Sequence, residues 1–166
     1  LLGKQTQLLV TEGMKDPKIA QLAGKNTQGK FIVSGVIGTA PSTTGPAVKQ
    51  FREAYQTTYN RTPGVFDPNT WDATALLVLA AEAAKSTSGA EIKDKIRTVA
   101  NAPGQEVTDV CQALDLIRQG KDINYQGASG KVDFDAQGDV VGSYDVWTID
   151  NNGQLKVTNT ITIGGS

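Results

Sequence analysis

The sequence predicts an α/β protein, and three observations support that prediction. Between residues 46 and 120, apolar residues recur at three- and four-residue steps, which is the period of amphipathic helices. Two short apolar runs before residue 40 have the length of strands. After Asp122 the pattern changes to a period of two, and strand–helix units followed by further strands define the α/β class.

The chain begins with a predicted strand and a short helix. Residues 7–10 form an apolar run that we expect to be the end of a strand. Asp16 and Pro17 then supply a helix N-cap and a proline at the first helical position. We expect Ile19 and Leu22 to face inward, and the glycine that follows two residues later to end the helix.

A second strand is predicted over residues 31–37. Its apolar residues fall on both faces, as in a parallel sheet that is covered on both sides. Residues 38–45 are rich in threonine, serine, proline and glycine, and we expect them to form a loop or a crossover.

Four helices follow. The second, from Asp67 to about Lys85, is apolar almost all round and must therefore be covered on most sides. Ser88 and Glu91 predict a capping box at the start of the third, and Gly120 ends the fourth. The apolar positions of the four helices are Val48, Phe51, Tyr55 and Tyr59; Leu76, Leu77 and Leu79; Ile92, Ile96 and Val99; and Val110, Leu114 and Ile117.

Three strands are predicted near the end of the chain. They cover residues 131–134, 144–149 and 155–163, with residues 150–153 as a hairpin turn. Only two short strands are predicted before residue 130, where the four helices lie. The helices therefore lack a sheet to pack on within this chain.

Composition argues against several functions. The 166 residues include 16 basic and 17 acidic side chains and no basic block, so no nucleic-acid partner is expected. The sequence has no histidine, which removes the commonest general base and the usual zinc ligand, so we do not expect an enzyme. The longest strongly apolar stretch, residues 73–84, is too short to span a bilayer.

Three features suggest a ligand but are better explained structurally. Residues 133–138 imitate the first half of an EF-hand loop, but position twelve would be Tyr144, so we expect a glycine-rich turn. Residues 127–131 are too few for a phosphate-binding loop. Cys111, the one cysteine, is expected to be a small core side chain rather than a reactive thiol. No metal and no cofactor is predicted.

Four patterned segments carry a family resemblance. They are Val10-Thr11-Glu12-Gly13, Phe66-Asp67-Pro68-Asn69-Thr70-Trp71-Asp72-Ala73, residues 127–139 and residues 144–153. In order and spacing, the chain resembles the type I periplasmic solute-binding proteins, and within them the branched-chain amino-acid receptors of ABC transporters. The resemblance runs along essentially the whole chain, which covers only the C-terminal part of such a receptor. It implies the two-lobed type I fold, present as an incomplete C-terminal portion.

The resemblance also implies a division into lobes. By the family pattern, residues 1–38 and 143–166 belong to the C-terminal lobe and residues 42–140 to the N-terminal lobe. The crossovers are expected near residues 38–42 and 140–143. The main sheets of both lobes would then come from sequence upstream of Leu1, which accounts for helices without a sheet.

Glu12 and Phe66 are the ligand-binding residues that the resemblance implies. Glu12 follows an apolar strand end, so its carboxylate should emerge at the edge of the sheet where open α/β folds bind ligands. From the residues alone, a solvated loop glutamate remains an alternative. In the resembled receptors the acid accepts hydrogen bonds from the solute's α-ammonium, and the aromatic residue at position 66 lines the cleft from the other lobe. Trp71 and Asp72 are expected to be packing and helix-start residues.

The implied function is that of a substrate-binding protein of an ABC importer, in the periplasm or tethered outside the cell. It would capture a small polar solute, an amino acid by resemblance, between two lobes and deliver it to a membrane permease. Its partners would be the solute, the permease subunits, and either the missing N-terminal portion or a second copy. The alternative is a ligand-sensing domain of the same fold in signalling or regulation.

Overall fold

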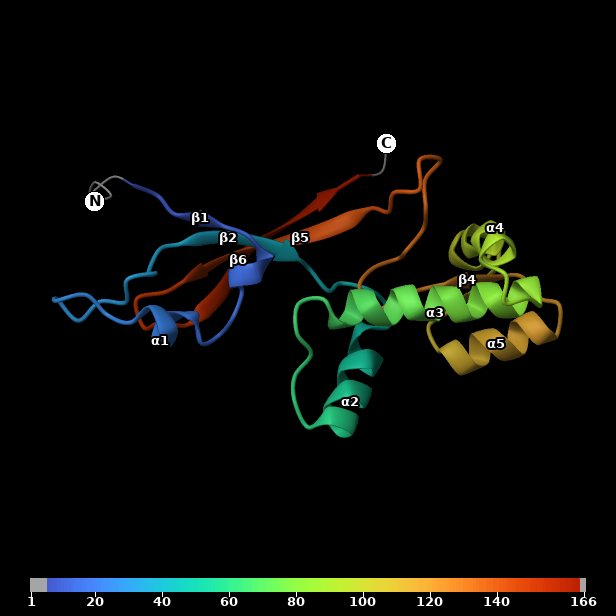
Figure 1. The fold of residues 1–166 in the computed structure, drawn as a ribbon, viewed down its shortest axis with the longest axis horizontal. Helices are drawn as coiled ribbons and strands as arrows, with labels where there is room; N and C mark the ends of the chain where they lie inside the picture. The colour runs from blue at the N-terminus through green and yellow to red at the C-terminus, as the bar shows by residue number, and fades with distance from the viewer. Residues whose placement is uncertain (1–5, 165–166) are drawn as a thin grey trace. The chain divides into compact units, whose positions relative to one another are not determined.

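The computed structural model describes residues 6–164, which form two compact units (Figure 1). One unit comprises the described chain up to Ser42 together with Ser143–Thr162. The other comprises Thr43–Gly142 and the described residues after Thr162. Helices and strands are mixed in the chain, which confirms the predicted α/β class.

The first unit is built on a four-stranded mixed sheet. Its strands are β1 (Leu9–Val10), β2 (Ile37–Pro41), β5 (Gly142–Ile149) and β6 (Leu155–Ile163), in the order β1-β2-β5-β6. β1 pairs with β2 in parallel, and β2 pairs with β5 in antiparallel fashion. The predicted final strands and the turn at residues 150–153 are confirmed.

The helix α1 (Ile19–Ala23) ends at Gly24, as predicted, and buries Ile19. The predicted N-cap is wrong, because Lys18 is the N-cap residue of α1 and Pro17 precedes the helix. Asp16 stabilises the preceding turn instead, where its Oδ1 accepts a hydrogen bond from the Lys18 backbone N–H at 2.7 Å. Leu22, however, is 80% exposed, so its predicted inward direction is wrong. A helix of five residues has room for one buried face only, and Ile19 and Ala20 occupy it.

The second strand was predicted in the wrong place. Residues 32–35 form turns, with Gly35 at φ +82°, Phe31 makes an isolated bridge with Lys25, and β2 occupies part of the segment that was expected to be a loop. Side chains of β2 alternate between exposed and buried, which indicates that one face of the sheet is covered, and its other neighbour, β5, is antiparallel. The sheet is therefore not of the fully covered parallel kind.

The second unit contains the four predicted helices and two further strands. These are α2 (Val48–Tyr59), α3 (Asp67–Ala84), α4 (Gly89–Ala100), α5 (Val110–Arg118), β3 (Gln105–Val107) and β4 (Ile123–Tyr125). The strands β3 and β4 pair in parallel, with α5 as the connection between them. Helices α4 and α5 both pack on α3 and on β4.

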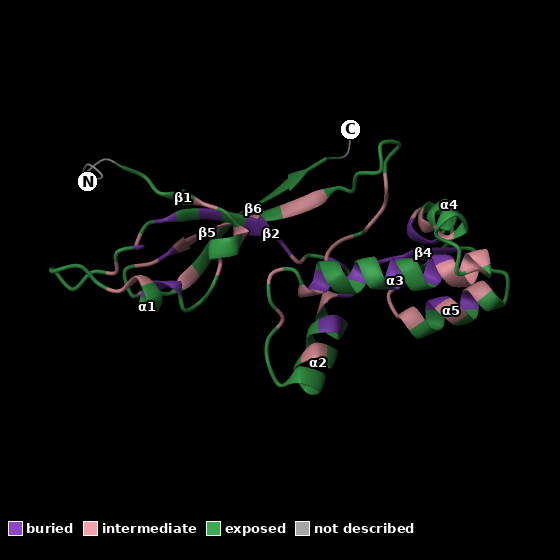
Figure 2. Ribbon diagram, in the orientation of Figure 1, coloured by how far each residue is buried: buried purple, intermediate pink, exposed green. Residues whose placement is uncertain are grey.

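Two apolar clusters hold the second unit together (Figure 2). The larger lies among α3, α4, α5 and the β3–β4 pair, and its fully buried members include Leu79, Ala100 and Tyr125. The smaller joins Phe51 of α2 to Ala128. Leu77, on another face of α3, is 52% exposed, so the helix is not covered on most sides within the described chain.

Other local predictions are corrected by the structure. Ser88 is the N-cap of α4, but its side chain makes no capping hydrogen bond, so the predicted capping box does not form. Residues 131–134 are not a strand and contribute only the bridge between Phe134 and Val140. Cys111 is exposed, because it lies on the side of α5 opposite the buried Ala113.

The glycine-rich turn at residues 133–138 is confirmed. Asp135 Oδ1 accepts hydrogen bonds at 2.9 Å from the backbone N–H groups of Gln137, Gly138 and Asp139. The carboxylate therefore closes the turn. None of the helices within residues 6–164 is long and apolar enough to cross a membrane.

Candidate ligand-binding site

Glu12 lies immediately beyond the parallel strand pair of the first unit. β1 ends at Val10, and Glu12 opens the single 3₁₀ turn η1 (Glu12–Met14), which contacts β2. The side chain is partly exposed. Within residues 6–164 its carboxylate takes part in none of the ion pairs or side-chain hydrogen bonds. An acidic group in this state is able to receive a cation.

Phe66 is the N-cap residue of α3, in the second unit. Its carbonyl accepts hydrogen bonds from the Thr70 backbone N–H at 2.9 Å and from the Thr70 hydroxyl at 3.0 Å. The aromatic ring does no capping, and the residue is 49% exposed. The ring is therefore available for contact with a ligand or with another part of the protein.

The residue after Phe66 anchors the helix start. Asp67 Oδ2 accepts hydrogen bonds from the Gly64 backbone N–H at 2.7 Å and from Arg61 Nη1 at 3.3 Å. The pKa of Asp67 lies below its ordinary value, chiefly because the Tyr55 hydroxyl donates to it and then because of the Gly64 N–H. Asp67 is thus a structural carboxylate, as expected for a helix start.

Asp72 is also structural, and it organises the glycine-rich segment at residues 127–131. It is 2% exposed and accepts hydrogen bonds from the Ala128 N–H at 2.9 Å, the Ser129 N–H at 2.7 Å and the Tyr125 hydroxyl at 3.2 Å. Burial, followed by the charge of Asp72, raises the pKa of Tyr125. This confirms the packing role predicted for Asp72.

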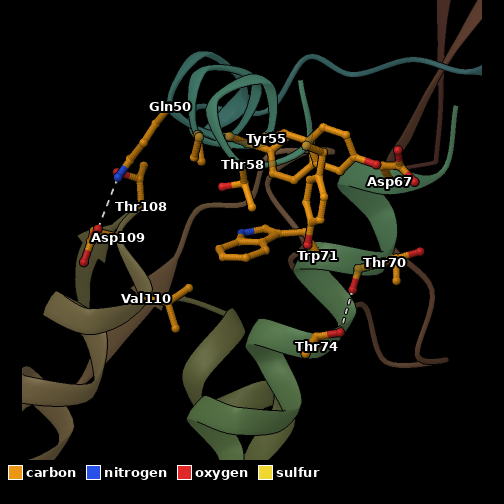
Figure 3. A pocket seen from close by; sticks show the side chains of 14 residues that line it. Gln50, Tyr55, Thr58, Asp67, Thr70, Trp71, Thr74, Thr108, Asp109 and Val110 are labelled. Atoms are coloured by element: carbon orange, nitrogen blue, oxygen red, sulfur yellow. Dashed lines mark hydrogen bonds between the residues drawn. The ribbon is translucent and has the colours of Figure 1, made fainter. Parts of the chain in front are cut away.

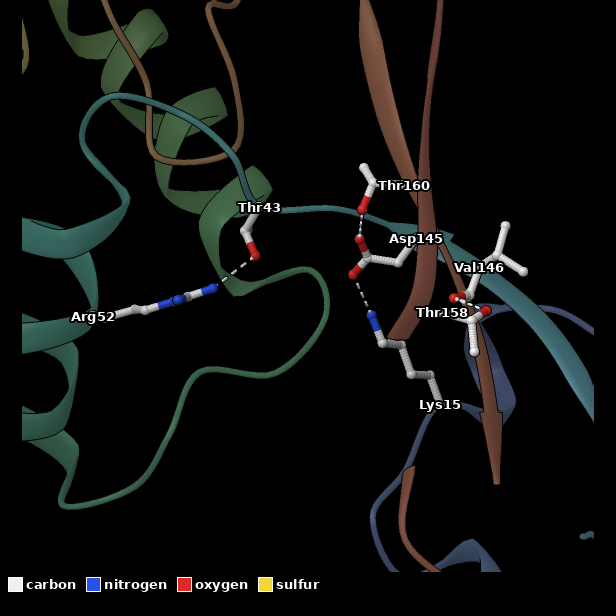
Figure 4. Close-up of polar contacts among 7 residues, drawn as sticks. All are labelled: Lys15, Thr43, Arg52, Asp145, Val146, Thr158 and Thr160. Carbon is white, nitrogen blue, oxygen red and sulfur yellow. Dashed lines mark hydrogen bonds and ion pairs between the residues drawn. The ribbon is translucent and has the colours of Figure 1, made fainter. Parts of the chain in front are cut away.

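A charged pair lies close to Glu12 in the sequence and within the same unit (Figure 4). Lys15 Nζ is 2.9 Å from Asp145 Oδ2, and the two side chains are 15% and 14% exposed. Asp145 Oδ1 accepts a hydrogen bond from the Thr160 hydroxyl at 3.1 Å. Burial alone would raise the pKa of Asp145, but hydrogen bonds from Ser42, Lys15 and Thr160, with the Lys15 charge, hold it below its ordinary value.

The second unit has an aromatic cavity of ≈ 620 Å³ between α2, the first turns of α3 and residues 108–110 (Figure 3). Trp71 is 48% exposed on its wall, with its ring centroid 5.9 Å from that of Phe51. Tyr55 and Tyr59 stack further along α2 at 4.7 Å. Phe51, Tyr55 and Tyr59 at helical spacing along α2 were a visible signal for this cavity, but the pattern was interpreted only as the packing face of the helix. Trp71 was expected to be a packing residue, and its packing on Phe51 leaves half of it uncovered.

The two predicted ligand-binding residues belong to different units. Glu12 is in the unit that contains the sheet, Phe66 is in the helical unit, and neither lines the aromatic cavity. Within the described chain no group of three or more histidine, cysteine or acidic residues has the arrangement of a metal site. The chemistry that these residues support is the capture of a cation by Glu12 and apolar contact by Phe66.

A short parallel strand pair that ends next to a partly exposed carboxylate, in an α/β chain, is typical of proteins that bind small ligands at the sheet edge. The family model described as the receptor family ligand binding region matches residues 5–152. The chain belongs to that family.

Two similar proteins agree with this assignment. The chemotactic signal transduction system substrate-binding protein BasB of Halobacterium salinarum is 27% identical over 173 residues, covering 92% of this chain and 41% of BasB. The solved leucine-binding protein LivK of Thermotoga maritima has a TM-score of 0.64 and 23% identity, covering 95% of this chain and 37% of LivK. The chain therefore spans about two fifths of the length of these proteins, and the predicted type I periplasmic-binding fold, present in part, is confirmed.

Proposed function

We propose that this chain is part of a non-enzymatic solute-binding protein that captures a small polar solute, an amino acid, between two lobes. The observation that carries this proposal is Glu12, a partly exposed carboxylate at the end of β1 with no partner among residues 6–164. A carboxylate that loses water when lobes close pairs strongly with an ammonium group. Phe66 would cover the apolar part of the solute from the other lobe.

The lobes of this proposal correspond to the predicted ranges. Residues 1–38 and 143–166 would belong to the C-terminal lobe, and residues 42–140 to the N-terminal lobe. The division of the described chain near residues 42 and 142 supports this assignment. Contacts to the solute's carboxylate would come from the part of the longer protein that this chain does not include.

The test is calorimetric titration of the full-length protein with the twenty proteinogenic amino acids. For the amino acid that binds best, Glu12→Gln should weaken binding about tenfold or more, because a hydrogen bond to a charged group is lost. Glu91→Gln, at an exposed position in α4, is the matched control and should change nothing. Unchanged affinity in Glu12→Gln, or no binding of any amino acid, would contradict the proposal.

We further propose that the bound form is presented to the permease of an ABC importer, in the periplasm or at the outer surface of the membrane. Sensing is the second candidate, and one observation favours it, because BasB is described as part of a chemotactic signal transduction system. Deleting the gene separates the two. Loss of radiolabelled solute uptake supports import, whereas loss of swimming bias toward the solute with normal uptake supports sensing.

A further inference from the structure

Three residues after Glu12, the same turn carries a lysine whose charge is held elsewhere. The Lys15 backbone N–H donates to the Glu12 carbonyl at 2.9 Å and closes η1. Lys15 is the C-cap residue of this turn, and its bond to the Glu12 carbonyl holds the two residues close together, so the long Lys15 side chain starts near the Glu12 carboxylate. Its partner is nevertheless Asp145, which lies 130 residues away in the sequence.

We propose that Asp145 keeps Glu12 available to the solute by holding the charge of Lys15 away from it and by fixing the turn that carries both. This inference rests on the proposed function, since it requires Glu12 to bind the solute's ammonium. An ammonium supplied by the protein itself would compete with that of the solute for the same carboxylate oxygens. Asp145 is thus a positioning residue that acts through Lys15.

Asp145 is well placed to hold a cation firmly. It lies in β5 opposite Ala40 of β2, and Thr160 of β6 donates to its second carboxylate oxygen, so three strands fix its position. Ser42, the residue after β2, is also bonded to β5, because its N–H donates to the Ser143 carbonyl at 2.8 Å. The Lys15 side chain therefore connects the Glu12 turn to a residue that is held by its neighbours in β2 and β6.

Without the Asp145 charge, the Lys15 ammonium would have lost its ion-pair partner. Lys15 is only 15% exposed, and a largely buried charge without a counter-ion is costly. The neighbouring Asp16 already uses one carboxylate oxygen, Oδ1, to accept from the Lys18 N–H at 2.7 Å. Glu12 has neither carboxylate oxygen engaged by another side chain in the described chain, so it is the acceptor that we expect Lys15 to reach.

The experiment uses the full-length protein and the best-binding amino acid from the titration above. Asp145→Asn keeps the shape of the side chain. It should weaken the binding of that amino acid about threefold or more, as expected when an ion pair between Lys15 and Glu12 competes with the solute. Lys15→Met/Asp145→Asn should regain the affinity of Lys15→Met, because no cation is left to occupy Glu12. The 2-hydroxy acid with the same side chain lacks the ammonium, so Asp145→Asn should leave its affinity unchanged.

A crystal structure of Asp145→Asn gives a direct reading. Lys15 Nζ within 4 Å of a Glu12 carboxylate oxygen is the expected result, and Lys15 still at position 145 would overturn the inference. Lys156→Met is the matched control. It breaks the 3.0 Å pair with Asp150, which follows the last residue of β5 in the same unit, five residues beyond Asp145 and so roughly 17 Å from it, and should not change affinity.

The outcomes separate the two proposals. If Glu12→Gln weakens binding but Asp145→Asn does not, the role of Asp145 is wrong and the proposed function stands. If the double variant binds as poorly as Asp145→Asn, competition by Lys15 is wrong. If Glu12→Gln has no effect, the proposed function fails and the inference fails with it.

Discussion

At the scale of single residues, Asp72 joins two segments that are far apart in the sequence. It sits in α3 and accepts four hydrogen bonds from residues 125–129, the three described above and one from the Ser129 hydroxyl. A side chain at Gly127 would collide with the Asp72 carboxylate, so glycine is needed there for the close approach. Residues 127–131, which resemble a phosphate-binding loop in sequence, therefore bind one buried carboxylate of the protein itself.

Asp72→Asn should lower the free energy of unfolding by about 2 kcal/mol, because an amide accepts at one oxygen and turns its NH₂ toward donors that need an acceptor. Asp115→Asn, an exposed aspartate whose carboxylate lies 3.6 Å from Arg118, is the control and should change the free energy by less than about 0.5 kcal/mol. Urea unfolding of the full-length protein followed by circular dichroism measures both. Equal effects of the two substitutions would contradict this account of Asp72.

The residues of the candidate site differ in how far sequence could predict them. Glu12 was identified because a strand-like run precedes it and the family pattern surrounds it, and whether it binds a solute remains a prediction. Asp145 was not identified, since it pairs with Lys15 across 130 residues and no local pattern marks such a contact. Sequence patterns report neighbours along the chain, whereas this pairing depends on the register of β2 with β5.

At the scale of elements, the β2–β5 pairing depends on one glycine. Gly38 lies directly opposite Trp147, which is fully buried, and a Cβ at Gly38 would collide with the indole ring. The side chain of Trp147 therefore covers the β2 backbone at a position where only glycine leaves room.

Gly38→Ala should lower the free energy of unfolding by about 2 kcal/mol, since the buried ring must move to admit the methyl group. Gly13→Ala is the control, because nothing lies within 4 Å of the added Cβ there. Thermal unfolding of the full-length protein measures the two variants. If Gly38→Ala melts at the same temperature as Gly13→Ala, the indole ring moves aside without loss of stability and this account is wrong.

Elements with their own periodicity were predicted well, and short elements were not. The helices α2 to α5 each repeat apolar residues over 9 to 18 residues, which is enough for a period to be read. The strands β3 and β4 have three residues each, and all of β4 is buried, so neither shows an alternation. Their pairing is set by packing against α4 and α5, which the local sequence does not encode.

At the scale of the whole molecule, the helical unit exposes several large apolar side chains on α2 and α3. Trp71, Leu77 and Val78 of α3 are 48%, 52% and 45% exposed, and Tyr59 of α2 is 61% exposed. Contiguous exposed apolar patches beyond a few hundred square ångströms are rare on monomers. We expect these faces to be covered by the remainder of the longer protein or by a second copy.

The isolated chain of residues 1–166 should accordingly self-associate, or bind the separately produced N-terminal portion. Multi-angle light scattering at several concentrations measures this, and Leu77→Glu, which places a charge on the exposed face of α3, should reduce the association. Ala90→Glu on α4, another exposed helix position, also adds one negative charge and serves as the control. A monodisperse monomer that does not bind the N-terminal portion would contradict the expectation.

The contrast between the two tryptophans has a practical consequence. Trp147 belongs to the sheet unit and is shielded from water, whereas Trp71 belongs to the helical unit and is half in water. Indole emission moves to longer wavelength as water surrounds the ring, so the chain contains two intrinsic fluorophores of different colour, one in each unit. Trp71→Phe and Trp147→Phe would each leave a single signal, and a solute titration could then be followed optically in one unit at a time without an attached dye.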